Sequence, residues 1–225
     1  MTALLQVSST LLQVNSLRKS FGTRQLLAVE GMTIEAGQIY ALTGDNGSGK
    51  STLLRIIAGL EPADDLKMSF GEYEVQGNSY PNGLRREIIY VHQHPYLFHS
   101  SLVANVEYGL KLRGINKTTR RELAHAAIEW AGLTALVEVP PRRLSGGEKQ
   151  KLAIARAKVL TPKLLLVDEP TANLDRPARE QIVALLRKMA SDNHAVVVAC
   201  HDRELIDLPG VRRLHLEAGR ITVSG

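Results

Sequence analysis

Residues 39–51 read Ile39-Tyr40-Ala41-Leu42-Thr43-Gly44-Asp45-Asn46-Gly47-Ser48-Gly49-Lys50-Ser51, an apolar run that leads into a glycine-rich loop. The loop matches the pattern G-x-x-x-x-G-K-[ST], and a strand before it with a helix after it is the context of a phosphate-binding loop rather than of a chance turn. Glycines let backbone N–H groups turn inward around phosphate oxygens, and the helix that starts near Lys50 adds its positive end. We therefore expect Lys50 to reach the β- and γ-phosphates of a nucleotide, Ser51 to bind Mg²⁺, and Thr52 to support the α-phosphate region.

Four apolar runs along the chain each end at a chemically special residue. The runs are 39–43, 88–91, 164–167 and 196–200, and they lead to Gly44, Gln93, Asp168 and His201. Continuous apolar runs are typical of strands in a sheet that is covered on both faces. Because ligands bind beyond the carboxyl ends of strands in open α/β sheets, we expect these four positions to meet at one site.

The order of the segments predicts an α/β fold with a P-loop core and a mainly parallel sheet. Residues 12–34 and 68–76 predict an antiparallel β subdomain in the N-terminal part. Between Gln93 and Leu144 the pattern changes to helices, expected over 102–112 and 120–131, which we interpret as a helical insertion. We predict a single domain over 1–225, with a nucleotide-binding core of 1–94 and 143–225 and a helical subdomain of 95–142.

Composition excludes several classes of protein. No apolar run approaches the length of a membrane span, and residues 1–5 lack the basic start of a signal peptide. The single cysteine excludes an internal disulfide framework and favours a reducing cytosol. The net charge of +5 comes from basic residues spread along the chain, which argues against nucleic acid as a partner.

An acidic pair, Asp168 and Glu169, follows the apolar run 164–167. We expect Asp168 to hold Mg²⁺, through water, and Glu169 to orient or deprotonate an attacking water. A polar strand terminus would be the simplest explanation for such a pair alone. The phosphate loop upstream favours the catalytic interpretation.

The segment Ser145-Gly146-Gly147-Glu148 admits two interpretations that can hold together. Ser145 and Glu148 form an S-x-x-E capping box at the start of a helix. Two glycines in a first helical turn cost up to about 1 kcal/mol each relative to alanine, and a cap alone does not need them. They are explained if a γ-phosphate approaches the backbone closely.

Other polar and aromatic residues have less specific signals. Gln93 can bridge Mg²⁺ or the attacking water to the helical insertion, and His201 can bond the γ-phosphate and Glu169. Phe21 can stack on a base or pack in the core. A metal site at His92, His94 and His99 is disfavoured because no acidic or thiol partner lies nearby in sequence.

Taken together, these motifs resemble the ATPase subunits of the ATP-binding cassette (ABC) family over nearly the whole chain. The matching elements follow the family's order: Phe21 at the adenine-stacking position, 44–52 at Walker A, Gln93 at the Q-loop, 144–150 at the signature, 164–169 at Walker B, 173–175 at the D-loop and His201 at the switch histidine. The resemblance implies that Ser145, Gly146 and Gly147 contact ATP held by a second subunit, and it adds Asp175 to the nucleotide-binding residues. It also implies ATP and Mg²⁺ as cofactors and a head-to-tail dimer that buries two ATP molecules.

The segment Gln93-His94-Pro95-Tyr96-Leu97-Phe98, with 101–106 after it, resembles bacterial importer ATPases. This implies a permease as partner, a solute-binding protein in the same system, and a place on the inner face of the cell membrane. The short form is similar to ATPases of oxyanion importers such as the tungstate type. The alternative is a soluble ABC ATPase of a cytosolic assembly, such as metal-cluster biogenesis. A P-loop kinase or GTPase is disfavoured because no Asn-Lys-x-Asp signature occurs.

Overall fold

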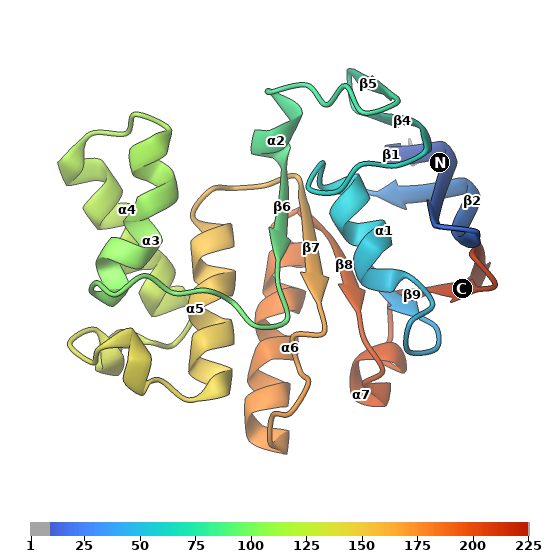
Figure 1. The fold of residues 1–225 in the computed structure, drawn as a ribbon. Helices are drawn as coiled ribbons and strands as arrows, with labels where there is room; N and C mark the ends of the chain where they lie inside the picture. The colour runs from blue at the N-terminus through green and yellow to red at the C-terminus, as the bar shows by residue number, and fades with distance from the viewer. Residues whose placement is uncertain (1–9, 225) are drawn as a thin grey trace, which may run out of the picture.

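The computed structural model describes residues 10–224, which form two sheets and a set of helices (Figure 1). Residues 1–9, where the sequence predicts no signal peptide, and residue 225 lie outside the described part. The strands are β1 (Thr10–Phe21), β2 (Arg24–Glu35), β3 (Ile39–Thr43), β4 (Asp65–Phe70), β5 (Tyr73–Gln76), β6 (Ile88–Val91), β7 (Leu164–Asp168), β8 (Ala195–Ala199), β9 (Val211–Glu217) and β10 (Arg220–Ser224). The helices are α1 (Lys50–Ile57), α2 (Leu84–Glu87), α3 (Leu102–Leu112), α4 (Lys117–Trp130), α5 (Gly146–Lys158), α6 (Arg176–Ser191) and α7 (Arg203–Ile206), with 3₁₀ turns η1 (Thr134–Leu136) and η2 (Pro141–Arg143).

The smaller sheet is antiparallel and has the order β2-β1-β4-β5. Buried residues alternate along β1 as Leu12 and Val14, and then skip to Leu17. The skip falls at the register shift between Val14 and Ser16 in the pairing with β4, because an extra residue turns the following side chains to the other face. The antiparallel subdomain predicted from the sequence is confirmed.

The larger sheet has the order β10-β9-β3-β8-β7-β6, with parallel pairing throughout except for β10 against β9. All five residues of β7 and of β8 are buried, as expected for strands covered on both faces. The strand ends therefore gather at one edge of the sheet, where the arrowheads of β6, β7 and β8 lie in Figure 1. The predicted mainly parallel α/β sheet is confirmed.

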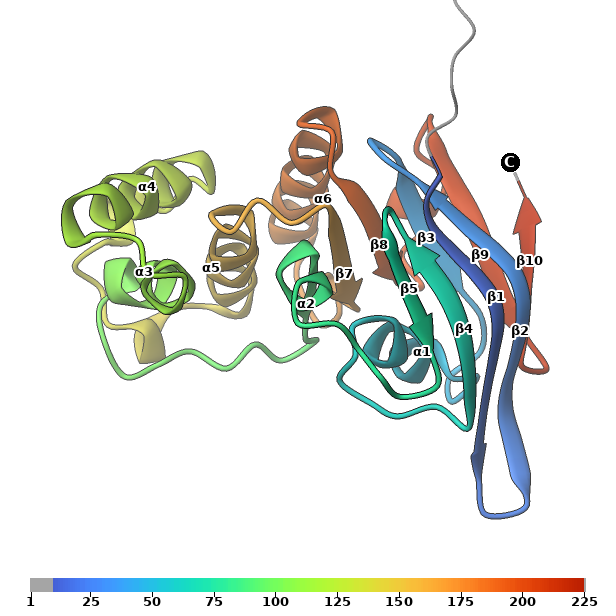
Figure 2. The same cartoon turned by 90° about the horizontal axis from the view of Figure 1, so that it is seen from above.

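Two hydrophobic cores lie on opposite faces of this larger sheet. Leu164 and Leu166 of β7 face the core that contains Leu53 and Leu54 of α1 and the apolar face of the smaller sheet. Leu165 and Val167 face the core formed by α3, α4, α5 and α6. Figure 2 shows the same layers: α1 lies next to β4, while α5 and α6 lie on the other side of β7. Alternate side chains of β7 therefore face α1 on one side of the sheet and α5 on the other.

The helices between the sequence motifs are α3 and α4, at the end of the molecule farthest from the smaller sheet (Figures 1 and 2). Side chains cap both helices: Ser101 accepts from the N–H of Ala104, and Asn116 accepts from the N–H of Thr119. Because Asn116 caps it, α4 begins at Lys117, three residues before the predicted start at 120. Within 10–224 the longest apolar helices fall short of what a membrane crossing needs.

Candidate functional site

The glycine-rich loop after β3 turns tightly around its own backbone. Gly44, Gly47 and Gly49 have φ angles of 143°, 76° and 107°, a region that favours glycine. A side chain at Gly44 would collide with the carbonyl oxygen of Leu216. Gly49 is the N-cap residue of α1, so the helix begins directly at the loop and directs its free N–H groups there.

Lys50 lies inside this loop with 5% of its surface exposed. Its Nζ donates to the carbonyl oxygens of Gly44 (2.8 Å) and Asp45 (3.0 Å), and lies 3.1 Å from Nε2 of His201. Because an ammonium group only donates, Nε2 of His201 can take part in this contact only as the acceptor. Burial lowers the pKa of Lys50, while the negative charges of Glu169 and Asp168 oppose that shift.

Asp168, at the end of β7, is held by two hydroxyl groups. Its Oδ1 accepts from Oγ of Ser51 at 2.9 Å, and its Oδ2 accepts from the phenol of Tyr90 in β6 at 2.8 Å. Only 4% of the Asp168 surface is exposed. Burial raises the pKa of Tyr90 well above its ordinary value, and its hydrogen bond to Asp168 adds to the shift, while the charge of Arg55 opposes it. Ser51 and Asp168, which the sequence assigns to one site, therefore touch.

Glu169 has a positive φ of 42°, because the chain leaves β7 here. Its N–H donates to the carbonyl oxygen of Ala199 at 2.8 Å, which fixes the turn against β8. Its carboxylate accepts from Nε2 of Gln93 at 3.1 Å, and its other oxygen lies 3.9 Å from Nε2 of His201. The four predicted strand-end positions thus come together, and the two neighbouring carboxylates have separate partners.

The main chain of Gln93 connects this cluster to α5. Its carbonyl oxygen accepts from Nε2 of Gln150, a buried side chain of α5, at 3.1 Å. Gln93 was expected to join the site to the helical insertion of 95–142, whereas α5 belongs to the predicted core of 143–225. The contact runs through its backbone to α5, while its side chain remains with Glu169.

Ser145 and Glu148 form the predicted capping box at the start of α5. Ser145 Oγ accepts from the N–H of Glu148 at 3.3 Å, and the N–H of Ser145 donates to Oε2 of Glu148 at 2.7 Å. A Cβ at Gly147 would lie 2.9 Å from Cβ of Ala178 in α6, so close helix packing also requires this glycine. This packing requirement at Gly147 was not predicted from the sequence. Within 10–224, no hydrogen bond or ion pair joins residues 145–148 to the phosphate loop, which lies across the sheet.

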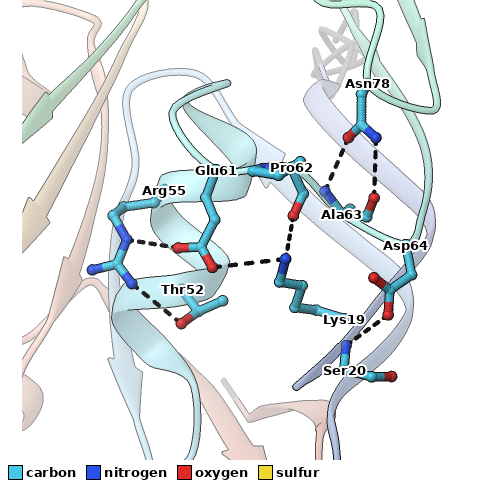
Figure 3. A network of polar contacts seen from close by, with 9 residues as sticks. All are labelled: Lys19, Ser20, Thr52, Arg55, Glu61, Pro62, Ala63, Asp64 and Asn78. Carbon is cyan, nitrogen blue, oxygen red and sulfur yellow. Dashed lines mark hydrogen bonds and ion pairs between the residues drawn. The ribbon is translucent and has the colours of Figure 1, made fainter. Parts of the chain in front are cut away.

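The remaining predicted residues have contacts outside this cluster. Phe21, the last residue of β1, is 55% exposed, and Nζ of Lys19 lies 5.0 Å from its ring centroid. Thr52 is buried and accepts from Nη2 of Arg55 at 3.4 Å (Figure 3). Asp175 caps α6 by accepting from the N–H of Ala178 at 2.9 Å. Asn46 is exposed at the surface of the loop.

Sequence reasoning missed Tyr90 and the ion pairs behind the loop. Arg55 Nε lies 2.9 Å from Oε2 of Glu61, and the other oxygen of Glu61 lies 4.0 Å from Nζ of Lys19 (Figure 3). The signal for Tyr90 was a single polar atom in the apolar run 88–91, three residues before Gln93. The ion pairs among Lys19, Arg55 and Glu61 depend on the folded structure, and no periodic pattern in the sequence indicates them.

The donor set fits the groups that the sequence implies. Ser51, Asp168 and Gln93 would supply oxygen ligands, which Mg²⁺ prefers. Inside the phosphate loop, Oγ of Ser48 is buried without a hydrogen-bond partner, and a phosphate oxygen would satisfy it. At the histidines, the N–H of His94 donates to Nδ1 of His92. Within 10–224 no group of three or more His, Cys, Asp or Glu is arranged to hold a metal ion.

Comparison with known proteins gives matches over most of the chain. The family model described as "ABC transporter" matches residues 29–172. The sulfate/thiosulfate import ATP-binding protein CysA of Synechococcus elongatus is 38% identical over 195 residues, 86% of this chain and 56% of that protein. The tungstate uptake system ATP-binding protein TupC of Peptoclostridium acidaminophilum is 39% identical over 170 residues, 75% of this chain and 76% of that protein. The chain thus spans little more than half the length of the sulfate importer protein that it matches.

Solved structures share the architecture. The cbiO1 protein of Clostridium perfringens, part of the transporter complex cbiONQ, superimposes with a TM-score of 0.85 at 28% identity, over 96% of this chain and 88% of that one. The ATP-binding cassette MJ0796, in a dimeric post-hydrolysis state with ADP and Pi, superimposes with a TM-score of 0.82 at 28% identity. The match covers 95% of this chain and 97% of that one.

Proposed function

The chain belongs to the ABC transporter family, and from this membership and the geometry of the site we propose that it is an ATPase subunit that drives a separate membrane permease. The observation that carries the proposal is the contact network at the strand ends. Lys50 and Ser51 of the phosphate loop touch His201 and Asp168, and Glu169 touches Gln93. Phosphate-binding and acid–base groups thus lie within hydrogen-bond distance of one another, as phosphoryl transfer to water requires.

Each residue has a distinct role in the proposed reaction. Lys50 exchanges its carbonyl contacts for the β- and γ-phosphate oxygens, and Phe21 stacks on the adenine. Ser51, Asp168 and Gln93 would hold Mg²⁺, which when bound neutralises charge on the phosphates. Glu169 accepts a proton from the attacking water while the amide of Gln93 fixes its carboxylate. His201 contacts both Lys50 and Glu169, so it can report the loss of the γ-phosphate.

A second chain completes the site in this proposal. Residues 145–147 begin α5 on the face of the sheet opposite to α1, so they cannot close over the nucleotide held by their own loop. They would contact ATP bound to a partner copy, with Asp175 at the same interface. The dimeric form of the similar cassette MJ0796 with ADP and Pi supports this arrangement.

The partner outside the dimer would be a permease. The similar proteins CysA and TupC are named for the import of sulfate or thiosulfate and of tungstate. We therefore propose an oxyanion importer, tungstate included, with a solute-binding protein in the same system. The chain would then lie on the inner face of the cell membrane, bound through its permease.

Glu169→Gln tests the proposed activity. The amide keeps the shape of the side chain but cannot accept a proton, so hydrolysis should fall about 10²–10⁴-fold while ATP binding remains. Size-exclusion chromatography with ATP should show the variant as a stable dimer. Glu72→Gln, at an exposed turn between β4 and β5, is the matched control and should hydrolyse normally. A Glu169→Gln chain with an unchanged rate would overturn the role of Glu169.

A further inference from the structure

Tyr90 is the polar group closest to the predicted metal carboxylate that the proposed reaction does not use. Strands β6 and β7 are parallel, with Tyr90 opposite Leu166, two residues before Asp168. The phenol is half-buried and donates to Oδ2 of Asp168 at 2.8 Å. The other oxygen, Oδ1, accepts from Ser51 at 2.9 Å. The two oxygens of the Asp168 carboxylate therefore accept hydrogen bonds from different neighbours.

The charge of Arg55, on α1, acts on the Tyr90 phenol. The guanidinium of Arg55 donates to Thr52 Oγ1 at 3.4 Å. Glu61 holds Arg55 at 2.9 Å, and Lys19, which lies 4.0 Å from Glu61, donates to the carbonyl of Pro62 at 2.7 Å (Figure 3). The side chains of Glu61 and Lys19 are 17% and 11% exposed, so this pair is shielded from solvent, whereas the Arg55 side chain is 35% exposed.

We propose that Tyr90 is a positioning residue for Mg²⁺: its hydroxyl fixes Oδ2 of Asp168 so that Oδ1 stays turned toward Ser51 and the phosphate loop. This inference rests on the proposed ATPase function. Each oxygen of the buried Asp168 carboxylate accepts one hydrogen bond, so without the Tyr90 hydroxyl only the bond from Ser51 would orient it. Outer-shell partners of metal ligands are known to fix them in this way, and their removal typically costs 10–100-fold in metal affinity or activity.

The simplest competing explanation is that the bond only ties β6 to β7. Tyr80 provides a matched control for that explanation. It is also half-buried, burial also raises its pKa, and its hydroxyl also donates at 2.8 Å, but to the carbonyl of Ile57 at the far end of α1. Tyr90→Phe and Tyr80→Phe thus remove the same group from similar surroundings, and only the first touches Asp168.

The test is the affinity for Mn²⁺, a spectroscopic substitute for Mg²⁺, measured by electron paramagnetic resonance. The full chain is loaded with a non-hydrolysable ATP analogue, with the protein in excess so that the analogue is bound. Tyr90→Phe should weaken Mn²⁺ binding at least about tenfold, and Tyr80→Phe should leave it unchanged. Binding of the analogue in EDTA should be the same for all three proteins, because the hydroxyl acts through the metal.

The outcomes separate the two proposals. Suppose that the wild-type chain binds the analogue and Mn²⁺. If the Mn²⁺ affinity of Tyr90→Phe then equals that of the wild type or of Tyr80→Phe, the role of Tyr90 is overturned and the ATPase proposal stands. If the wild-type chain adds no Mn²⁺ affinity to that of the free analogue, both are overturned. Arg55→Met keeps the hydroxyl and removes the neighbouring charge, so it should lose part of the Mn²⁺ affinity. If Arg55→Met binds Mn²⁺ as tightly as the wild type, the ion pairs of Figure 3 do not contribute to the positioning of Asp168.

Discussion

Glu169 has a backbone conformation that few non-glycine residues adopt, and this conformation separates it from Asp168. With a φ of 42°, Glu169 turns out of β7 while its N–H remains bonded to Ala199. Asp168 stays in the strand direction and meets Ser51, whereas the Glu169 carboxylate meets Gln93. Strain of this kind costs on the order of 1–3 kcal/mol and is found at functional sites. Here it gives two adjacent carboxylates separate partners.

Cys200, next to His201, gives a prediction at the same scale. Burial raises its pKa to about 12, and only 2% of its surface is exposed. With that pKa about one thiol in ten thousand is ionised at pH 8, and the thiolate is the reactive form. We expect the native chain to resist Ellman's reagent at pH 8 while the chain unfolded in urea reacts at once. Because the sequence has one cysteine, the colour reports this position alone. Rapid labelling of Cys200 in the native chain would contradict its burial after the end of β8.

Single elements show what the sequence could and could not predict. Strands β3, β7 and β8 were located closely because their residues are almost all apolar, and the site residues at their ends followed from that. The start of α4 was missed because Asn116 was not read as a cap. Tyr90 was missed because the pattern of apolar residues in β6 does not show which side chain its hydroxyl contacts. Its partner Asp168 is 78 residues away in the chain, and such contacts depend on tertiary structure.

Helix α5 carries a prediction about its two glycines. A Cβ at Gly147 would meet Cβ of Ala178 at 2.9 Å, whereas one at Gly146 would lie 3.3 Å from the flexible end of Leu174. Gly147→Ala should therefore lower the free energy of unfolding by about 1–3 kcal/mol, and Gly146→Ala should change it by less than about 0.5 kcal/mol. Urea titration measures both. Ala178→Gly should restore much of the loss in the double variant, because it removes the opposing methyl group. Equal effects of the two alanines would refute tight packing between α5 and α6.

At the scale of the whole molecule, the sheet separates the two elements that are proposed to bind phosphate. Alternate residues of β7 face α1 on one side and the core of α5 and α6 on the other. Both α1 and α5 begin at the edge where β7 and β8 end (Figure 1). A chain with this layout presents its phosphate loop and its Ser145 helix start in the same direction but on different faces. Two copies related by a two-fold axis can then pair each loop with the other copy's α5.

Ser145→Arg tests this layout. The long cation should block contact with a partner's nucleotide, so the variant should bind ATP as a single chain and fail to hydrolyse it. Asn116→Arg removes a comparable cap from α4 and should hydrolyse normally, which separates the loss of a cap from the loss of the shared site. Mixing Ser145→Arg with Glu169→Gln should restore hydrolysis, because the mixed dimer contains one site with both groups intact. If the sites act independently and dimers form at random, the recovery is about a quarter of the wild-type rate. A Ser145→Arg chain that hydrolyses ATP at the wild-type rate on its own would refute the shared site.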